Sequence, residues 1–166
     1  MNTRIKAMFA CLLLWAGSAK ATLIDFEGVI ADGESFYSTD RLYVGDGFLL
    51  RDAFGFDEVT LYAPSAGFNH NGSDIFGMAG YSTFEISDFG GELFSLLSFD
   101  ATNLDPAGYS DFIIEGIYGT GGHISSGFFY PDRNSFTTFS FDVAWSGLKK
   151  VYIHNLGSAM AIDNIN

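Results

Sequence analysis

The stretch Phe136-Thr137-Thr138-Phe139-Ser140-Phe141-Asp142 guides the interpretation of the rest of the chain. Phe139 and Phe141 are two residues apart and are separated by a serine, and a period of two is typical of a half-buried β-strand. Successive side chains of a strand point to opposite faces, so these two phenylalanines share one face. The stretch therefore predicts a strand with one face toward a core.

Short runs of the same kind, separated by Gly, Asp and Asn, occur along most of the sequence. They predict strands over Thr22–Glu27, Phe48–Ala53, Glu58–Tyr62, Ser82–Asp88, Leu93–Ala101, Asp111–Tyr118, His123–Phe129, Phe136–Asp142, Leu148–His154 and Ala159–Ile165. Helix signals are nearly absent between these runs. About ten strands joined by turns favour an all-β fold, an antiparallel β-sandwich, over a parallel α/β sheet.

Two segments read as loops because they are rich in Gly, Pro, Asn and Asp. They are Ala63–Ala79 and Asp100–Ser110. The first is long for a compact domain, and long loops are often functional. A plain crossover between two sheets explains it equally well. In the predicted strand Asp111–Tyr118, Glu115 shares a face with two isoleucines, so we expect it at a sheet edge or paired.

The N-terminus has the three parts of a secretory signal peptide. Arg4 and Lys6 form a basic start, Ala7 to Ala16 is apolar, and Ala19-Lys20-Ala21 is a small-x-small cleavage signal. The apolar run is shorter than the roughly 20 residues of a membrane span. A buried N-terminal helix is the alternative. We therefore expect residues 1–21 to be removed, leaving a single domain over residues 22–166 with no transmembrane segment.

Removal of the signal peptide makes an acidic chain more acidic. The whole sequence carries 8 Lys and Arg against 20 Asp and Glu, a net charge of −12. Three cationic residues and no acidic residue leave with the signal peptide, so the net charge becomes −15. Such a surface repels nucleic acid and anionic lipid, which excludes both as expected partners. The chain's single cysteine, Cys11, also leaves, so the mature domain has no disulfide and depends on its core.

The order of the strand motifs resembles that of a known group of exported proteins. The motifs are Leu23-Ile24-Asp25-Phe26-Glu27, Leu93 to Asp100, Phe112-Ile113-Ile114-Glu115-Gly116, Gly121-Gly122, Phe136 to Phe141, Leu148 to Ile153 and Met160-Ala161-Ile162-Asp163-Asn164-Ile165. They resemble the β-sandwich ectodomains of the PEP-CTERM, or exosortase-sorted, protein group. The first-strand acid and the last-strand Asp are also similar to those of carbohydrate-binding jelly rolls. The resemblance implies a jelly-roll sandwich that is secreted or held at the cell surface.

The group's C-terminal sorting tail consists of a Pro-Glu-Pro motif, a transmembrane helix and a basic end. This sequence shows none of these before Asn166. Either the tail has been lost or removed, or this member is released without sorting. We therefore expect export without the anchoring that the resemblance would otherwise imply.

Acidic residues at both ends of the domain predict a structural calcium site. If the first and last strands lie side by side, Asp25 or Glu27 comes near Asp163, and Ca²⁺ prefers such oxygen ligands. A bulge at Asp163-Asn164 would keep Ile162 and Ile165 in the core and redirect the Asp163 side chain. The alternatives are solvated acids at strand ends, or an Asp163 that accepts backbone N–H bonds in a turn.

Aromatic and amide side chains around the first loop predict a carbohydrate-binding surface. The expected ligand-binding residues are Tyr62, Phe68, Asn69, His70, Asn71 and Tyr81. Sugar rings stack on exposed aromatic rings, and amides bind sugar hydroxyls. Core packing is the alternative for most aromatic residues of such a chain. In Phe128-Phe129-Tyr130, alternation requires at least one ring to leave the core.

No catalytic motif stands out in the sequence. The histidines His70, His123 and His154 are scattered, and there is no H-E-x-x-H or G-x-S-x-G motif. Any two of the 20 acids could form a glycosidase pair, but no spacing selects one. We therefore expect a non-catalytic surface or extracellular-matrix protein, and extracellular polysaccharide is its first candidate ligand. A secreted polysaccharide hydrolase and a purely structural matrix protein are the alternatives.

Overall fold

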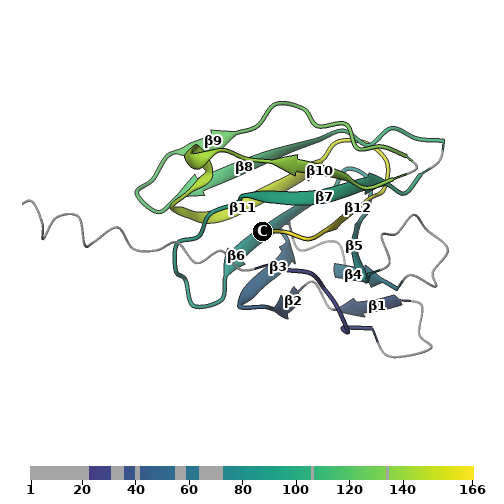
Figure 1. The fold of residues 1–166 in the computed structure, drawn as a ribbon, viewed down its shortest axis with the longest axis horizontal. Helices are drawn as coiled ribbons and strands as arrows, with labels where there is room; N and C mark the ends of the chain where they lie inside the picture. The colour runs from purple at the N-terminus through teal and green to yellow at the C-terminus, as the bar shows by residue number, and fades with distance from the viewer. Residues whose placement is uncertain are drawn as a thin grey trace, which may run out of the picture.

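The structure is a computed structural model that describes residues 23–30, 36–39, 42–54, 59–63, 73–105, 107–133 and 135–166. Within these ranges the chain forms two antiparallel six-stranded sheets (Figure 1). The first sheet has the order β1 (Phe36–Thr39), β4 (Val59–Tyr62), β5 (Ile75–Met78), β12 (Met160–Asp163), β7 (Ser98–Asn103) and β10 (Thr137–Ser140). The second has the order β2 (Leu42–Gly45), β3 (Phe48–Asp52), β6 (Thr83–Asp88), β11 (Leu148–Asn155), β8 (Phe112–Tyr118) and β9 (His123–Ser125). A short 3₁₀ helix, η3 (Val143–Trp145), precedes β11.

The chain crosses repeatedly between the two sheets, so neighbours within a sheet are mostly distant in the sequence. In the centre of the second sheet, for example, β11 pairs with both β6 and β8. This connectivity is that of a jelly-roll sandwich, which confirms the predicted fold class.

The two ends of the domain pair with each other, which was the condition set for the predicted calcium site. Ile24 and Ile165 form an antiparallel bridge, with N–H···O distances of 2.7 and 3.0 Å. Asn164 has a left-handed backbone, with φ of 49°, between the buried Asp163 and Ile165. This kink at the predicted position lets both Ile162 and Ile165 face the core.

Three strands were not predicted from the sequence, and one of them corrects the first predicted loop. β5 lies inside Ala63–Ala79, and each of its four residues is buried. Alternation fails as a signal there because both faces of the strand are covered. β1 and β2 were also missed, and the run from Leu93 enters the first sheet only at Ser98. At residues 22–27, the described part contains a single bridge at Ile24 instead of a strand.

Aromatic rings make up much of the core between the sheets. Phe99 is 1% exposed, and its ring lies 5.5 to 6.4 Å, centroid to centroid, from those of Phe112, Phe129, Phe139 and Phe141. Phe139 and Phe141 both pack on this core, which confirms that they share a face. Closely spaced aromatic rings add to the stability that burial of their area provides.

Three turns meet at one end of the sandwich. Asn155 Nδ2 donates 2.8 Å hydrogen bonds to the carbonyl oxygens of Ala79 and Ser158, and Ser110 Oγ donates to the Ser158 carbonyl at 3.1 Å. Gly157 is packed so tightly that a Cβ there would collide with the carbonyl oxygen of Tyr109. These contacts hold the turns in fixed positions.

Candidate functional site

The side of the second sheet that faces away from the core carries a row of polar side chains. Phe84 and Ile86 of β6, Val151 and Ile153 of β11, and Phe112 and Ile114 of β8 all lie in the core. Because side chains alternate along each strand, the residues between them point outward. Register then aligns Arg51, Glu85, Tyr152, Glu115 and Ser125 across five adjacent strands. We call this surface the outer face, and it also includes Thr83, Lys150, His154, Ile113, Ile117 and His123.

Glu85 lies at the centre of an ion-pair network on the outer face. Its carboxylate contacts Arg51 Nη2 at 2.9 Å and Lys150 Nζ at 3.0 Å, and the residue is only 4% exposed. Burial alone would raise the pKa of Glu85, but the hydrogen bonds and charges of Arg51 and Lys150 lower it below its ordinary value. Glu85 is therefore ionised at neutral pH and fixes the position of both cations.

A second polar chain of contacts runs through His154. Its Nδ1 lies 3.2 Å from the hydroxyl of Thr83, and its Nε2 lies 3.4 Å from Oε2 of Glu115. Glu115 is thus in an interior strand and faces a partner, in agreement with the predicted pairing. The contacts on both ring nitrogens fix the orientation of the imidazole.

Tyr152 occupies the middle of the row, between Glu85 and Glu115. Its ring centroid lies 6.1 Å from that of His154, and the two ring planes differ by 33°. Partial burial and the negative charge of Glu85 raise the pKa of Tyr152, so the phenol keeps its proton at neutral pH. The two rings form a short aromatic platform with charged groups on either side.

Glu85, one of the two carboxylates beside Tyr152, is poorly suited to acid catalysis. Glu85 and Glu115 are two strands apart, roughly 10 Å between backbones, which is close to the carboxyl separation of inverting glycosidases. A glycosidase acid, however, needs a raised pKa so that it carries a proton. The pKa of Glu85 is lowered instead. The row thus holds and orients charged groups, and it lacks the acid that glycoside hydrolysis would require of Glu85.

The structure does not gather the predicted ligand-binding residues that it describes. Tyr62 ends β4 beside Ile75, the first residue of β5, and its half-buried ring lies over Gly77. Tyr81 follows the other end of β5 and is 84% exposed. Strand β5 thus separates the two tyrosines by roughly 10 Å or more. The other four predicted residues, Phe68, Asn69, His70 and Asn71, lie outside the described residues.

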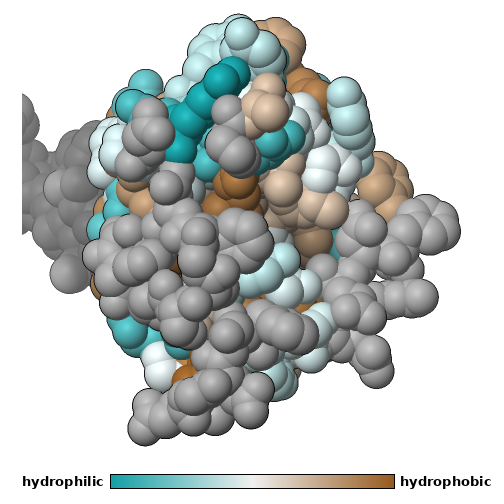
Figure 2. Space-filling model, turned by 90° about the vertical axis from the view of Figure 1, so that its right-hand side faces the viewer, coloured by the Kyte–Doolittle hydropathy of each residue, from teal (hydrophilic) through white to brown (hydrophobic). Residues whose placement is uncertain are grey.

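The end of the sandwich seen in Figure 2 shows mixed surface character. Hydrophilic residues gather in the upper part of this view, next to more hydrophobic ones. The described part of this surface is therefore not a continuous apolar patch.

The predicted metal ligands lie in an acidic neighbourhood. Asp25 accepts a 3.1 Å hydrogen bond from the backbone of Glu27, and the fully buried Asp163 accepts one from Ser73 Oγ at 2.5 Å. Slight burial and the charges of Asp74, Asp163 and Asp25 raise the pKa of Glu27. Among the described residues, no three acidic, histidine or cysteine side chains form a group that could hold a metal ion. Calcium binding stays a prediction.

Phe128, Phe129 and Tyr130 alternate as expected. Phe129 bridges Phe112 and packs on the core, whereas Phe128 and Tyr130 are 56% and 67% exposed. The two exposed rings are stacked at a centroid distance of 6.5 Å. Because Phe129 points inward opposite Phe112, its two neighbours lie on the same side as the outer face, at its β8 border.

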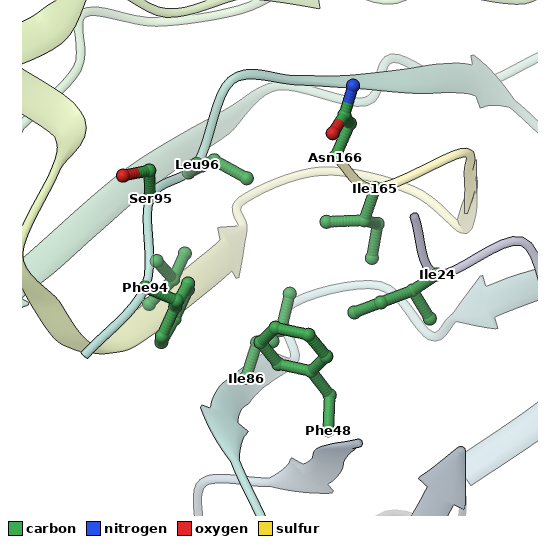
Figure 3. Close-up of a pocket in the computed structure, with 9 residues that line it drawn as sticks. Ile24, Phe48, Ile86, Phe94, Ser95, Leu96, Ile165 and Asn166 are labelled. Carbon is green, nitrogen blue, oxygen red and sulfur yellow. The ribbon is translucent and has the colours of Figure 1, made fainter. Parts of the chain in front are cut away.

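A cavity inside the sandwich is too small for a sugar. Figure 3 shows Phe48, Ile86, Phe94 and Ile165 around it, with the polar groups of Ser95 and Asn166 turned away. Its volume is about 10 Å³, close to the smallest space that holds one water molecule. The apolar lining and small size make it a packing defect that could not hold a carbohydrate.

Sequence reasoning missed the outer face because its members come from five predicted strands. The signal was present in part, since alternation within Ser82–Asp88 and Leu148–His154 places Glu85, Tyr152 and His154 opposite the core residues. The sequence does not give the order of the strands in the sheet, and without that order these side chains cannot be placed in one row.

Comparisons with known proteins give matches among solved structures alone. No family model matches the chain, and no curated protein matches it. A family 29 carbohydrate-binding module is 13% identical, covers 80% of this chain and 90% of its own, and has a TM-score of 0.46. A DUF4465 family protein from Bacteroides caccae is 15% identical over 91% of this chain and 95% of its own, with a TM-score of 0.46.

An agarase, AgWH50C, is 12% identical over 89% of this chain, with a TM-score of 0.47, and the match spans 26% of the agarase. These likenesses concern the architecture and assign no ligand to this chain. Nowhere in the described ranges does a helix reach the length and apolar character of a membrane crossing. The order of the strands in its two sheets makes the chain an all-β jelly-roll sandwich.

Proposed function

We propose that this protein is a non-catalytic polysaccharide-binding protein and that the outer face is its binding surface. The observation that supports the proposal most is the row across the sheet, in which Tyr152 lies between fixed charged groups. Aromatic rings bind the apolar faces of sugars, while a few well-placed polar groups orient the hydroxyls. On the outer face, Tyr152 and His154 would supply the rings, and Arg51, Lys150 and Glu115 the polar groups.

We further propose that the protein is exported and acts outside the cell, at the surface or in an extracellular matrix. The support is the sequence of residues 1–21, which lie outside the described residues, and the resemblance to PEP-CTERM ectodomains. Cell fractionation followed by N-terminal sequencing tests both points. Recovery of a chain that starts at Thr22 from the medium or matrix is the expected result, and an intact N-terminus in the cytoplasm would refute export.

Binding is tested by isothermal titration calorimetry with a panel of soluble polysaccharides and with matched tyrosine variants. We expect Tyr152→Ala to weaken binding about tenfold, which corresponds to about 1.4 kcal/mol. Tyr81→Ala is the comparison variant, because Tyr81 is 84% exposed and belongs to the loop site predicted from the sequence, whereas Tyr152 lies in the middle of the outer face. If Tyr81→Ala abolished binding and Tyr152→Ala did not, the loop site predicted from the sequence would replace the outer face.

The alternative functions give different outcomes in the same experiments. A hydrolase would release reducing sugar ends from a polysaccharide that it binds, and the lowered pKa of Glu85 makes this residue unsuitable as the acid of such a reaction. A purely structural matrix protein would neither bind nor cleave any polysaccharide. Absence of binding across a broad panel at high protein concentration would refute the proposed function.

Calcium as a structural ion is a separate proposal, and its support is the electrostatics around Glu27. A bound Ca²⁺ would relieve the repulsion from Asp25, Asp74 and Asp163 that helps to raise its pKa. Because the described acids do not converge as a ligand set, binding would have to draw them together. We expect Ca²⁺ to raise the melting temperature of the wild type but not of Asp163→Ala. A wild type that does not respond to Ca²⁺ would refute the site.

A further inference from the structure

We infer that the outer face binds an acidic polysaccharide and that Arg51 and Lys150 bind its anionic group, a carboxylate or a sulfate ester. This inference rests on the proposed function, because it names the ligand class of the same surface. The inference follows from the net charge of the group formed by Arg51, Glu85 and Lys150. This local charge is positive, whereas the net charge of the whole chain is negative.

The network of Arg51, Glu85 and Lys150 carries one uncompensated positive charge. Two cations contact a single carboxylate, at 2.9 and 3.0 Å. The lowered pKa of Glu85 keeps that carboxylate charged, and Arg and Lys are both protonated at neutral pH. A single negative charge from a ligand would therefore neutralise the network.

Both cations can still reach a ligand. The side chains of Arg51 and Lys150 are 49% and 28% exposed, whereas that of Glu85 is 5% exposed beneath them. A guanidinium has five N–H donors and an ammonium has three, so neither group is used up by one carboxylate. The buried Glu85 thus holds two cationic donors at the surface of the sheet, where a carboxylate or sulfate could accept from both.

The next carboxylate along the row has a different partner. Glu115 lies three strands from Arg51, roughly 14 Å between backbones, and on the strand next to that of Lys150. It also faces His154, at 3.4 Å. At 0.15 M salt the screening length is about 8 Å, so the remaining acids of the chain are also screened over most of the surface. An acidic polymer would therefore be attracted locally although the protein as a whole is negative.

Tyr152 connects this cationic pair to the aromatic platform. It is the cross-strand neighbour of Glu85 and lies two residues from Lys150 on the same face of β11. An acidic sugar could place its ring on Tyr152 and its anionic group between the two cations. Uronic acids and sulfated sugars have both features in one residue.

The test compares ligands that differ in charge alone. Calorimetry at 0.15 M NaCl would use oligogalacturonate and its methyl ester, and dextran sulfate and dextran for the sulfate form. We expect at least one of the anionic ligands to bind fivefold or more tightly than its neutral counterpart. This comparison uses the wild type and does not depend on the folding of any variant.

Matched variants then locate the charge. Arg51→Gln and Lys150→Gln should each weaken binding of the preferred anionic ligand at least fivefold. Lys149→Gln is the control. Lys149 is exposed at the bulge beside Lys150, and its substitution removes the same charge as Lys150→Gln does. Its affinity should stay within twofold of the wild type.

The outcomes separate this inference from the proposed function. Equal binding of the charged and neutral ligands would refute the inference and leave polysaccharide binding intact. An equal loss in Lys149→Gln and Lys150→Gln would also refute it, because the attraction would then be diffuse. If none of the ligands nor the wider panel bound, both proposals would fail.

Discussion

Replacement of Glu85 by glutamine should destabilise the protein by about 2 kcal/mol at pH 7. The variant keeps the shape of the side chain but leaves Arg51 and Lys150 facing each other without a counter-charge. Loss of one partner from a fully buried pair costs about 3–5 kcal/mol, whereas exposed pairs are worth about 0–1 kcal/mol. Glu85 is buried but its partners are 49% and 28% exposed, so the cost should fall between these limits.

The pH dependence of this effect has a definite sign. The pKa of Glu85 is lowered in the folded state, so the native protein binds its proton less readily than the unfolded chain. The contribution of Glu85 is therefore complete above the ordinary pKa of 4.5 and is lost as the pH falls through the lowered folded pKa. The difference between wild type and Glu85→Gln should shrink accordingly.

Urea denaturation at pH 7 and at pH 3 measures both quantities. A loss of about 2 kcal/mol corresponds to a melting temperature lower by about 4–8 °C for a domain of this size. Variants Arg51→Gln and Lys150→Gln complete double-mutant cycles that divide the effect between the two partners. A change below about 0.5 kcal/mol at pH 7, within the range of ordinary surface substitutions, would refute this account of the network.

Three further predictions concern the core, the acidic end and the turns. Phe99→Ala should cost about 3–5 kcal/mol in chemical denaturation, because it leaves a cavity among four rings, whereas the exposed Phe128→Ala should have little effect; equal effects would contradict the core assignment. Glu27→Gln should raise the melting temperature at pH 7, because slight burial and nearby like charges raise the pKa of Glu27 and so disfavour its charged form in the folded state. This gain should disappear as the pH falls below that pKa. A pH-independent gain would exclude repulsion as the cause. Gly157→Ala should cost about 1–3 kcal/mol, because its Cβ would strike a backbone carbonyl, whereas Gly127→Ala enters open space and should change stability by less than about 0.5 kcal/mol; the same unfolding curves test both.

The sequence alone determined the fold class because the signal for it is local. Alternation within single strands, as in Thr137 to Phe141, reports which side of the strand is buried and needs no knowledge of neighbours. The spacing of Ile162 and Ile165 also indicated where a bulge would keep both isoleucines inward, because that spacing is local too. Where both faces of a strand are buried, as in β5, the same signal disappears.

The tertiary structure alone decided which polar side chains meet. Arg51, Glu85, Tyr152 and Glu115 come from four strands whose order in the sheet differs from their order in the chain. Cross-strand neighbours are set by the pairing and register of whole strands, so no local sequence pattern predicts them. The sequence placed the expected ligand site on a loop because aromatic and amide residues are close together there. The folded sheet brings a buried acid, two cations and an aromatic platform together from distant positions, such as Arg51 and Tyr152, which are 152 − 51 = 101 residues apart in the chain.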